Sequence, residues 1–212
     1  MSYAVKEIFL TLQGEGGQIG RTSVFCRFTG CNLWSGQEAD RKDAVCQFCD
    51  TNFVGMDGEN GGRFPDAQSL ANAIEACWGT IRDPKQRFVV FTGGEPLLQL
   101  DKVLIEAIKQ KGFYIAVETN GTLPVPQGVD WICVSPKAGA ELIQISGDEL
   151  KLIYPQEGLD PHRFTSLDFT TFRLQPKDDM NKTEHIKKAI KYCQEHPLWH
   201  LSLQTHKLIG IP

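Results

Sequence analysis

Seven short apolar segments, each ending in a polar or glycine-rich tip, constrain the fold of this chain more than any other feature. Each is rich in β-branched and aromatic residues, and continuous apolar runs of this kind are typical of parallel strands buried on both faces. The sequence therefore predicts a sheet of mostly parallel strands. The segments cover residues 23–30, 87–96, 113–121, 131–137, 149–155, 171–177 and 199–207.

Three amphipathic segments between the predicted strands have the apolar spacing of helices. The first places Leu70 and Ile74 on one face, and the second ends at Gly112, which suits a helix C-terminus. Alternation of strands and helices implies right-handed βα units. The predicted helices cover residues 66–79, 98–112 and 181–196.

The connections between the strands near residues 116, 133 and 151 are too short to hold full helices. We therefore expect an α/β fold in which about six parallel strands form a partial (β/α) barrel, with a doubly wound sheet as the alternative. No repeat or charge block divides the chain, so we expect one domain over residues 1–212, with an enlarged loop at 31–50. In either architecture ligands bind at the carboxyl ends of the strands, where the polar tips gather.

Composition narrows the partners and the compartment. A net charge of −4 does not support a nucleic-acid surface. The N-terminus lacks the pattern of a secretory signal, and no apolar run approaches the ~18 residues of a membrane span. Seven cysteines, an odd number, indicate a reducing compartment and thiols used as ligands rather than disulfides. We therefore expect a cytoplasmic protein without a nucleic-acid or membrane partner.

Three cysteines, Cys31, Cys46 and Cys49, have the spacing C-x14-C-x2-C. Cys26 would complete a four-cysteine zinc site, but strand alternation places it with Val24 on a packing face. Three thiolates alone could instead hold three irons of a [4Fe-4S] cluster and leave the fourth iron open to a ligand. The remaining cysteines lie on apolar faces and are expected in the core: Cys77, Cys133 and Cys193.

A second candidate site is the segment FTGGEPLLQ, residues 91–99. Gly93 and Gly94 follow a predicted buried strand, and glycines there allow close approach of a ligand to the backbone. Glu95 comes next, at the strand tip. An ordinary turn is the alternative interpretation.

These motifs together resemble the radical S-adenosylmethionine superfamily, and within it the 7-carboxy-7-deazaguanine synthase family. The resemblance rests on the opening EIFLTLQGEGGQIGRTSVFCRFTGCNLW, the cysteine loop with Phe48 before its last cysteine, GGEP, ETNG, SPK, LQP and the ending LSLQTHK. It covers nearly the whole chain. The commonest superfamily spacing is C-x3-C-x2-C, and some members of the synthase family carry an enlarged cluster loop like this one.

The resemblance implies a radical rearrangement. The cysteines would bind a [4Fe-4S] cluster, whose open iron takes S-adenosylmethionine and cleaves it to a 5′-deoxyadenosyl radical. The radical would remove hydrogen from C6 of 6-carboxy-5,6,7,8-tetrahydropterin, the ring would contract, and ammonia would leave to give 7-carboxy-7-deazaguanine. The family also implies an electron donor such as a flavodoxin or ferredoxin, and a homodimer.

Strand-end residues are the candidates for S-adenosylmethionine binding, as partners for its amino group, carboxylate or ribose. The family also uses Mg²⁺, which Asp50 and Thr51 could help to hold, although the two residues could merely cap a turn. The candidates for S-adenosylmethionine are Phe48, Asp50, Gly93, Gly94, Glu95, Glu118, Ser135, Pro136, Lys137 and Gln175.

For the pterin substrate, Arg27 offers a fork of donors that suits a carboxylate, with an ion pair to Glu15 or another acid as the alternative. The polar LQGEG segment suits a pterin edge or is a surface turn, and Thr92 lies at a strand end. The carboxylate of Pro212 could bind the guanidine-like edge, or the terminus could fray. The candidate substrate residues are Leu12, Gln13, Gly14, Glu15, Arg27, Thr92 and Pro212.

Two other functions fit parts of the pattern. One is an activase of the same superfamily that makes a glycyl radical on a partner protein, although the opening LQGEGGQIG and the ending QTHK argue against it. The other is a non-catalytic zinc-binding module. Such a module would neither assemble an iron–sulfur cluster nor cleave S-adenosylmethionine.

Overall fold

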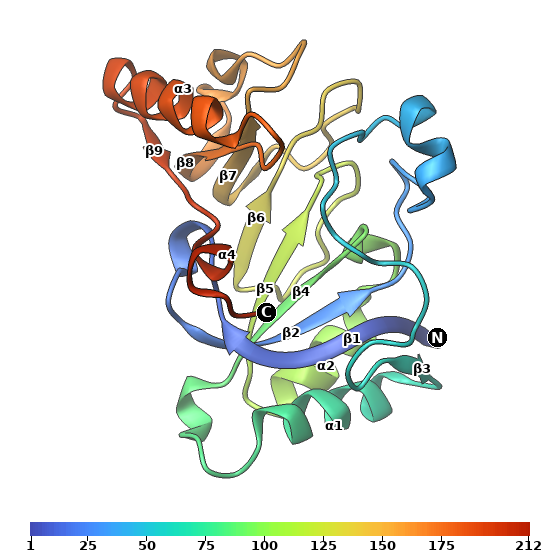
Figure 1. The fold of residues 1–212 in the computed structure, drawn as a ribbon. Helices are drawn as coiled ribbons and strands as arrows, with labels where there is room; N and C mark the ends of the chain where they lie inside the picture. The colour runs from blue at the N-terminus through green and yellow to red at the C-terminus, as the bar shows by residue number, and fades with distance from the viewer.

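The computed structural model describes residues 1–212, which form one curled sheet of nine strands with helices on its outer side (Figure 1). The strand order is β3-β1-β2-β4-β5-β6-β7-β8-β9. From β2 to β9 every neighbouring pair is parallel, whereas β1 is antiparallel to both β2 and β3. The strands are β1 Tyr3–Leu12, β2 Thr22–Phe28, β3 Gly62–Phe64, β4 Phe88–Gly93, β5 Tyr114–Thr119, β6 Trp131–Val134, β7 Ser146–Tyr154, β8 Asp168–Pro176 and β9 Trp199–Leu201.

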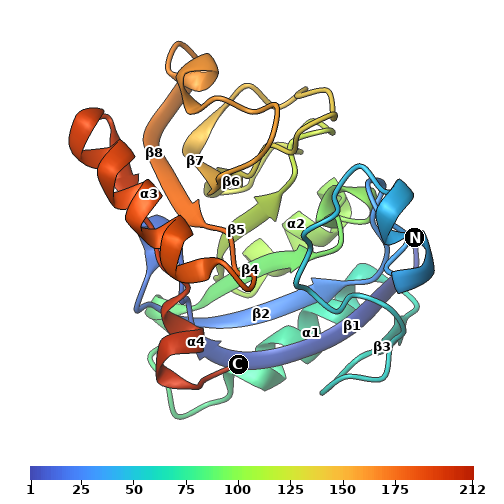
Figure 2. The same cartoon turned by 45° about the horizontal axis from the view of Figure 1, so that its top comes forward.

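The curl makes the sheet a partial barrel that stays open between its two ends (Figure 2). The helices are α1 Ala67–Trp78, α2 Lys102–Gln110, α3 Lys182–Glu195 and α4 Thr205–Ile209. Short 3₁₀ helices cover η1 Gly16–Gln18, η2 Glu38–Asp43, η3 Pro84–Gln86, η4 Pro96–Leu98 and η5 Pro161–Phe164. The predicted partial barrel is confirmed, with seven successive parallel strands in place of about six. None of the helices combines the length and apolar character needed to cross a membrane.

Local capping explains where the helices begin. The Asp66 carboxylate accepts a hydrogen bond from the Ser69 N–H at the start of α1, at 2.8 Å. Asp101 does the same for Leu104, so α2 begins at Lys102 and not near Leu98 as predicted. The residues before it form η4.

The last predicted strand, residues 199–207, is only partly right. β9 pairs with β8 for three residues, and the Ser202 N–H still donates to the Leu174 carbonyl of β8. The chain then leaves the sheet, and the Thr205 N–H donates to the Gly14 carbonyl. The polar tip that follows begins α4. The antiparallel strands β1 and β3 were not among the predicted strands.

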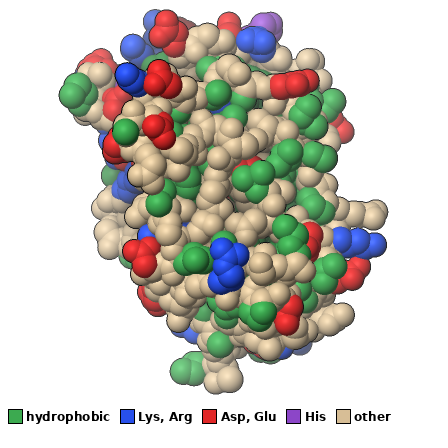
Figure 3. Space-filling model, turned by 90° about the vertical axis from the view of Figure 1, so that its right-hand side faces the viewer, with side chains coloured by type: hydrophobic (Ala, Val, Ile, Leu, Met, Phe, Trp, Pro, Cys, Tyr) green, Lys and Arg blue, Asp and Glu red, His purple; other side chains and the backbone are tan.

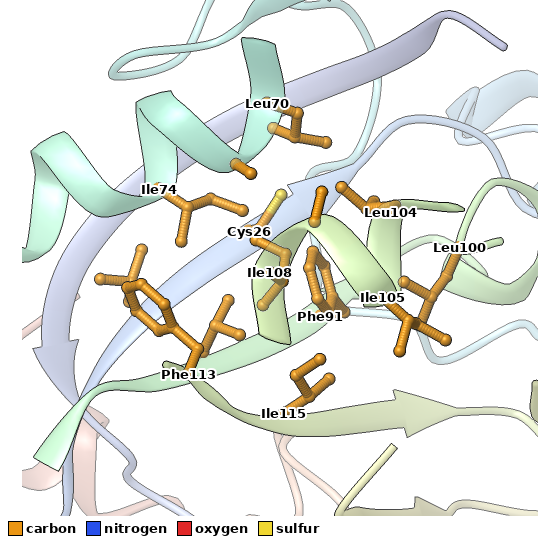
Figure 4. Close-up of a cluster of buried hydrophobic side chains, with 14 of the residues drawn as sticks. Cys26, Leu70, Ile74, Phe91, Leu100, Leu104, Ile105, Ile108, Phe113 and Ile115 are labelled. Atoms are coloured by element: carbon orange, nitrogen blue, oxygen red, sulfur yellow. The ribbon is translucent and has the colours of Figure 1, made fainter. Parts of the chain in front are cut away.

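The larger core lies between the sheet and the helices α1 and α2 (Figure 4). Leu70 and Ile74 pack from α1, and Leu104 packs from α2, against Cys26 and Phe91 of the sheet. Because Cys26 is fully buried here, on the helix-covered side of β2, its predicted packing role is confirmed. A second core joins β6 to β9 with α3.

The other predicted core cysteines divide into two kinds. Cys77 and Cys193 are half-buried and pack against the two cores, as expected. Cys133 is buried but points away from its apolar neighbour Val134 and lies opposite Glu118 of β5. Its prediction as an apolar core residue is therefore corrected: it belongs to the inner, polar face of the barrel.

Candidate active site

A cleft of about 360 Å³ opens on the inner side of the sheet at the carboxyl ends of its parallel strands. Its walls come from the loop after β1, the cysteine loop, the tips of β4, β5, β6 and β8, and the C-terminal segment. Its size is that of an ordinary small-ligand site. All of the predicted site residues line it except Glu95 and Pro136.

The three cysteines of the loop share this cleft. Cys31, Cys46 and Cys49 are free thiols on its wall, whereas Cys26 faces the core on the other side of β2. A zinc site of four cysteines is therefore excluded by position. No three Cys, His, Asp or Glu side chains converge at metal-binding distance in this structure, so the thiols share a wall without forming a closed ligand group. As a donor set, three thiols with no fourth cysteine fit an open iron–sulfur cluster.

The two glycines of the GGEP tip allow a close approach of other backbone segments of the chain rather than of a ligand. A Cβ at Gly93 would stand 2.2 Å from the Phe28 carbonyl oxygen. A Cβ at Gly94 would stand 2.0 Å from the Gly30 oxygen and 2.8 Å from the Cβ of Cys31. The tip therefore packs directly against the segment that carries the first cysteine. The sequence interpretation had expected a ligand in this close contact.

Replacing Gly94 by alanine is expected to displace the Cys31 segment, because the new methyl group meets backbone atoms. The expected cost is about 1–3 kcal/mol of stability, with lower iron content after anaerobic reconstitution. Thermal unfolding of the metal-free chain and iron per chain measure the two effects. Gly158→Ala is the control for backbone strain without a clash, since φ is +76° there and nothing lies within 4 Å of a Cβ. It should lose about 1–2 kcal/mol of stability and keep wild-type iron content. Wild-type iron content and melting temperature in Gly94→Ala would contradict the expectation.

Glu95 is fully buried behind the cleft wall. Its carboxylate accepts hydrogen bonds from the Thr119 hydroxyl at 2.7 Å and from the Asn120 N–H at 2.8 Å. Burial raises its pKa, and these hydrogen bonds oppose the rise. The side chain therefore stabilises the neighbouring ETNG tip, and its predicted contact with a ligand stays a prediction. Pro136 also lies outside the cleft wall, where its carbonyl accepts from Gln156.

Lys137 presents a half-buried cation at the tip of β6. Its Nζ donates to the carbonyl and hydroxyl oxygens of Ser135, at 2.6 and 2.7 Å, and it makes no ion pair with a carboxylate. Burial lowers its pKa, which the charges of Cys46 and Cys49 oppose. An anionic group of a ligand would therefore find an uncompensated donor here.

A charged group on the inner face of β7 was missed by the sequence interpretation. The Nζ of Lys151 lies 2.8 Å from Glu15 Oε2 and 2.9 Å from Glu118 Oε2, and its side chain is 5% exposed. Gln13 donates to Oε1 of Glu118, and Gln204 donates to Oε1 of Glu15. Two charged residues alternating with leucines in ELKL were the signal that β7 has one polar face.

The pair with Lys151 keeps Glu15 ionised. Burial alone would raise the pKa of this carboxyl, but Lys151 and the amide donors outweigh burial and lower it from 4.5 to about 2. An ionised carboxylate is an acceptor only. Glu15 therefore offers the cleft an acceptor for N–H groups.

The lowered pKa of Glu15 predicts a loss of stability in acid. Its stabilising contribution is complete above its unfolded pKa near 4.5 and disappears as the pH falls toward its folded value of about 2. We therefore expect the stability advantage of wild type over Glu15→Gln to shrink between pH 5 and about 3. Urea unfolding of the metal-free chain measures it, with exposed Glu157→Gln as the control. An advantage that does not change with pH would contradict the assignment.

Arg27 lines the cleft but is already paired. Its Nε lies 2.7 Å from Glu7 Oε1, so the predicted alternative, an ion pair with an acid, is present with Glu7 rather than Glu15. Thr92 is its register partner on β4. The two side chains place a guanidinium and a hydroxyl side by side on the inner face.

The C-terminal segment completes the wall. Asp50 is held by Lys207 Nζ at 2.6 Å and Gln204 Nε2 at 3.2 Å, which the sequence did not reveal. His206 packs against Gly14, and burial lowers the pKa of its imidazole. A main-chain oxygen of Pro212 accepts from the Thr11 hydroxyl at 2.9 Å. The QTHK motif thus connects the cysteine loop to the loop after β1 through Gln204, which donates to both Asp50 and Glu15. In the sequence interpretation this motif had a place only in the family resemblance.

Comparisons with known proteins agree with this geometry. Residues 41–206 match the model of the radical SAM superfamily. The chain is 61% identical to the 7-carboxy-7-deazaguanine synthase of Caulobacter vibrioides, 59% to that of Bordetella pertussis and 56% to that of Burkholderia multivorans, with 100% of each chain covered. The crystal structure of QueE from Escherichia coli has the same fold, with a TM-score of 0.68 and 24% identity over 97% of this chain and 95% of that one.

Proposed function

Because the chain belongs to the radical SAM superfamily and, within it, to the 7-carboxy-7-deazaguanine synthase family, we propose that its cleft converts 6-carboxy-5,6,7,8-tetrahydropterin to 7-carboxy-7-deazaguanine with loss of ammonia. It is an enzyme that depends on a [4Fe-4S] cluster and S-adenosylmethionine. The observation that carries the proposal is one cleft with three free thiols on one wall and the polar residues after β1 on another. The cluster and S-adenosylmethionine, when bound, supply the radical chemistry.

The chain's own residues supply binding and orientation. Cys31, Cys46 and Cys49 would hold the cluster. Lys137, half-buried without a carboxylate partner, would bind the carboxylate of S-adenosylmethionine, since it is the uncompensated cation beside the cysteines. The remaining proposed contacts to this cofactor are Phe48, Asp50, Gly93, Gly94, Glu118, Ser135 and Gln175, together with the backbone at Glu95 and Pro136.

The substrate would lie on the other side of the cleft. Ionised Glu15 would accept from the N–H edge of the pterin, with Gln13 beside it. Arg27 keeps guanidinium donors beyond those that face Glu7, and these suit the substrate carboxylate. Leu12, Gly14, Thr92 and Pro212 are the further proposed substrate residues.

Mg²⁺ is the third proposed ligand. Lys207 neutralises the Asp50 carboxylate, so Thr51 is the more available oxygen donor of the two. Mg²⁺ keeps several waters in protein sites, which suits one hydroxyl and one substrate carboxylate as its other ligands.

We further propose that the chain is one domain, that it forms a homodimer in the cytoplasm, and that a flavodoxin or ferredoxin reduces its cluster. On the face shown in Figure 3, Lys and Arg side chains are scattered among Asp and Glu and form no basic patch. This distribution does not support a nucleic-acid partner.

Anaerobic incubation of the reconstituted enzyme with dithionite, S-adenosylmethionine and carboxytetrahydropterin tests the function. We expect 5′-deoxyadenosine and 7-carboxy-7-deazaguanine, identified by mass. Formation of 5′-deoxyadenosine without the deazaguanine would reject the substrate while leaving the superfamily assignment intact. Absence of both from a cluster-loaded enzyme would reject the activity as a whole.

A further inference from the structure

Lys207, at the third position of α4, joins two parts of the cleft that are far apart in the sequence. Its Nζ pairs with Asp50, directly after the last cysteine, and with Asp178, just beyond the tip of β8. Asp178 is held in turn by Lys182 of α3, at 2.8 Å. Both carboxylates that face Lys207 therefore come from walls of the cleft.

Hydrogen bonds to the rest of the chain fix the segment that carries this lysine, residues 202–207. The Thr205 N–H donates to the Gly14 carbonyl at 2.9 Å, and the Gly16 N–H donates to the Ser202 hydroxyl at 3.0 Å. Gln204 bridges Glu15 and Asp50. Figure 2 shows α4 between α3 and the end of β1. A short helix fixed to the sheet thus carries the lysine.

The cysteine loop, residues 31–50, has few other attachments. Its hydrogen bonds and ion pairs to the rest of the chain are made by Asn32 at one end and Asp50 at the other. Those of Arg41, for example, stay within the loop. The loop also contains all three cysteines that line the cleft. Packing also holds the loop, because the Trp34 ring lies 5.5 Å from the ring of Phe53 and Cys46 is buried. The contacts of Asp50 are therefore the polar restraint on the end of the loop.

We propose that Lys207 is a positioning residue that fixes the end of the cysteine loop over the cleft by pairing with Asp50 and Asp178. The link to cluster binding rests on the proposed function, whereas the restraint on the loop does not. Lys207 touches neither a cysteine nor a reacting atom. Its action is to hold the segment of Cys46 and Cys49 in its observed position near the tip of β8.

Amide hydrogen exchange of the metal-free full chain tests the restraint. Lys207→Met keeps the length of the side chain and removes its charge. We expect exchange of the Ala44 and Cys46 amides, which donate to the carbonyls of Arg41 and Leu33, to accelerate about three- to tenfold, as two partly exposed ion pairs allow. Lys207→Arg should restore slow exchange. Lys182→Met is the matched control because it loses a pair with Asp178 but none with Asp50. High salt should speed exchange in wild type and change Lys207→Met little.

Iron release from the reconstituted protein into a chelator, without oxygen, gives the second measurement. We expect release to be about three- to tenfold faster in Lys207→Met, with wild-type rates in Lys207→Arg and Lys182→Met. Unchanged exchange in Lys207→Met, or the same acceleration in Lys182→Met, overturns the inference. A protein with faster exchange that makes no deazaguanine even as wild type would retain this inference and reject the proposed function.

Discussion

Replacing Cys31, Cys46 or Cys49 by alanine is expected to abolish cluster binding and reduce turnover to background, whereas Cys26→Ala retains both. The three thiols line the cleft, and each is proposed to be one ligand of the cluster. Cys26 lies in the core between β2 and the helices, so its loss costs about 1–2 kcal/mol of packing and no ligand.

Anaerobic reconstitution followed by iron and sulfide analysis measures the difference, with the cluster absorbance near roughly 400 nm as the spectroscopic check. Cys77→Ala is a second control, because that thiol packs half-buried against the core. Loss of the cluster in Cys26→Ala would show that the ligand set is wrong. Retention of the cluster in any of the three cleft variants would do the same.

Lys151→Met is expected to be the most damaging substitution for stability outside the apolar core. It removes the cation between Glu15 and Glu118 and leaves two carboxylates in the barrel interior without their partner. Removing one member of a buried ion pair costs about 3–5 kcal/mol. For a chain of this length that corresponds to a melting temperature lower by roughly 10 °C.

The same group offers a rescue. Adding Glu15→Gln and Glu118→Gln to Lys151→Met removes the unpaired charges and should recover a large part of the lost stability. Thermal unfolding of the metal-free variants at neutral pH measures both steps, and Lys191→Met, at an exposed surface pair, is the control. A melting temperature within 2 °C of wild type for Lys151→Met would contradict this account of the interior.

These two expectations describe the two halves of the cleft. One wall carries soft thiol donors, which we propose hold a metal cluster, and the floor carries a lysine that keeps Glu15 ionised by lowering its pKa. Burial lowers the pKa of Lys137 but leaves Lys151 charged, because only Lys151 has carboxylate partners. The same residue type therefore presents a free donor in one place and a structural counter-ion in the other.

Much of this architecture could be predicted from local patterns. Apolar runs with polar tips identified the parallel strands, and helical spacing identified α1, α2 and α3, because burial repeats with the period of each element. The alternation in β2 placed Cys26 in the core and Arg27 on the inner face. Spacing together with the apolar faces of the other four cysteines separated Cys31, Cys46 and Cys49 from them.

Other features required the three-dimensional structure, since they depend on pairs that are distant in the chain. Glu95 turns toward Asn120, away from the cleft, because a buried carboxylate takes the nearest N–H donors. Lys151 pairs with Glu15, which lies 136 residues away in the sequence, and Lys207 pairs with Asp50, which lies 157 residues away. Patterns along the chain report which face a residue takes, and only the closing of the sheet into a partial barrel decides which charges meet there.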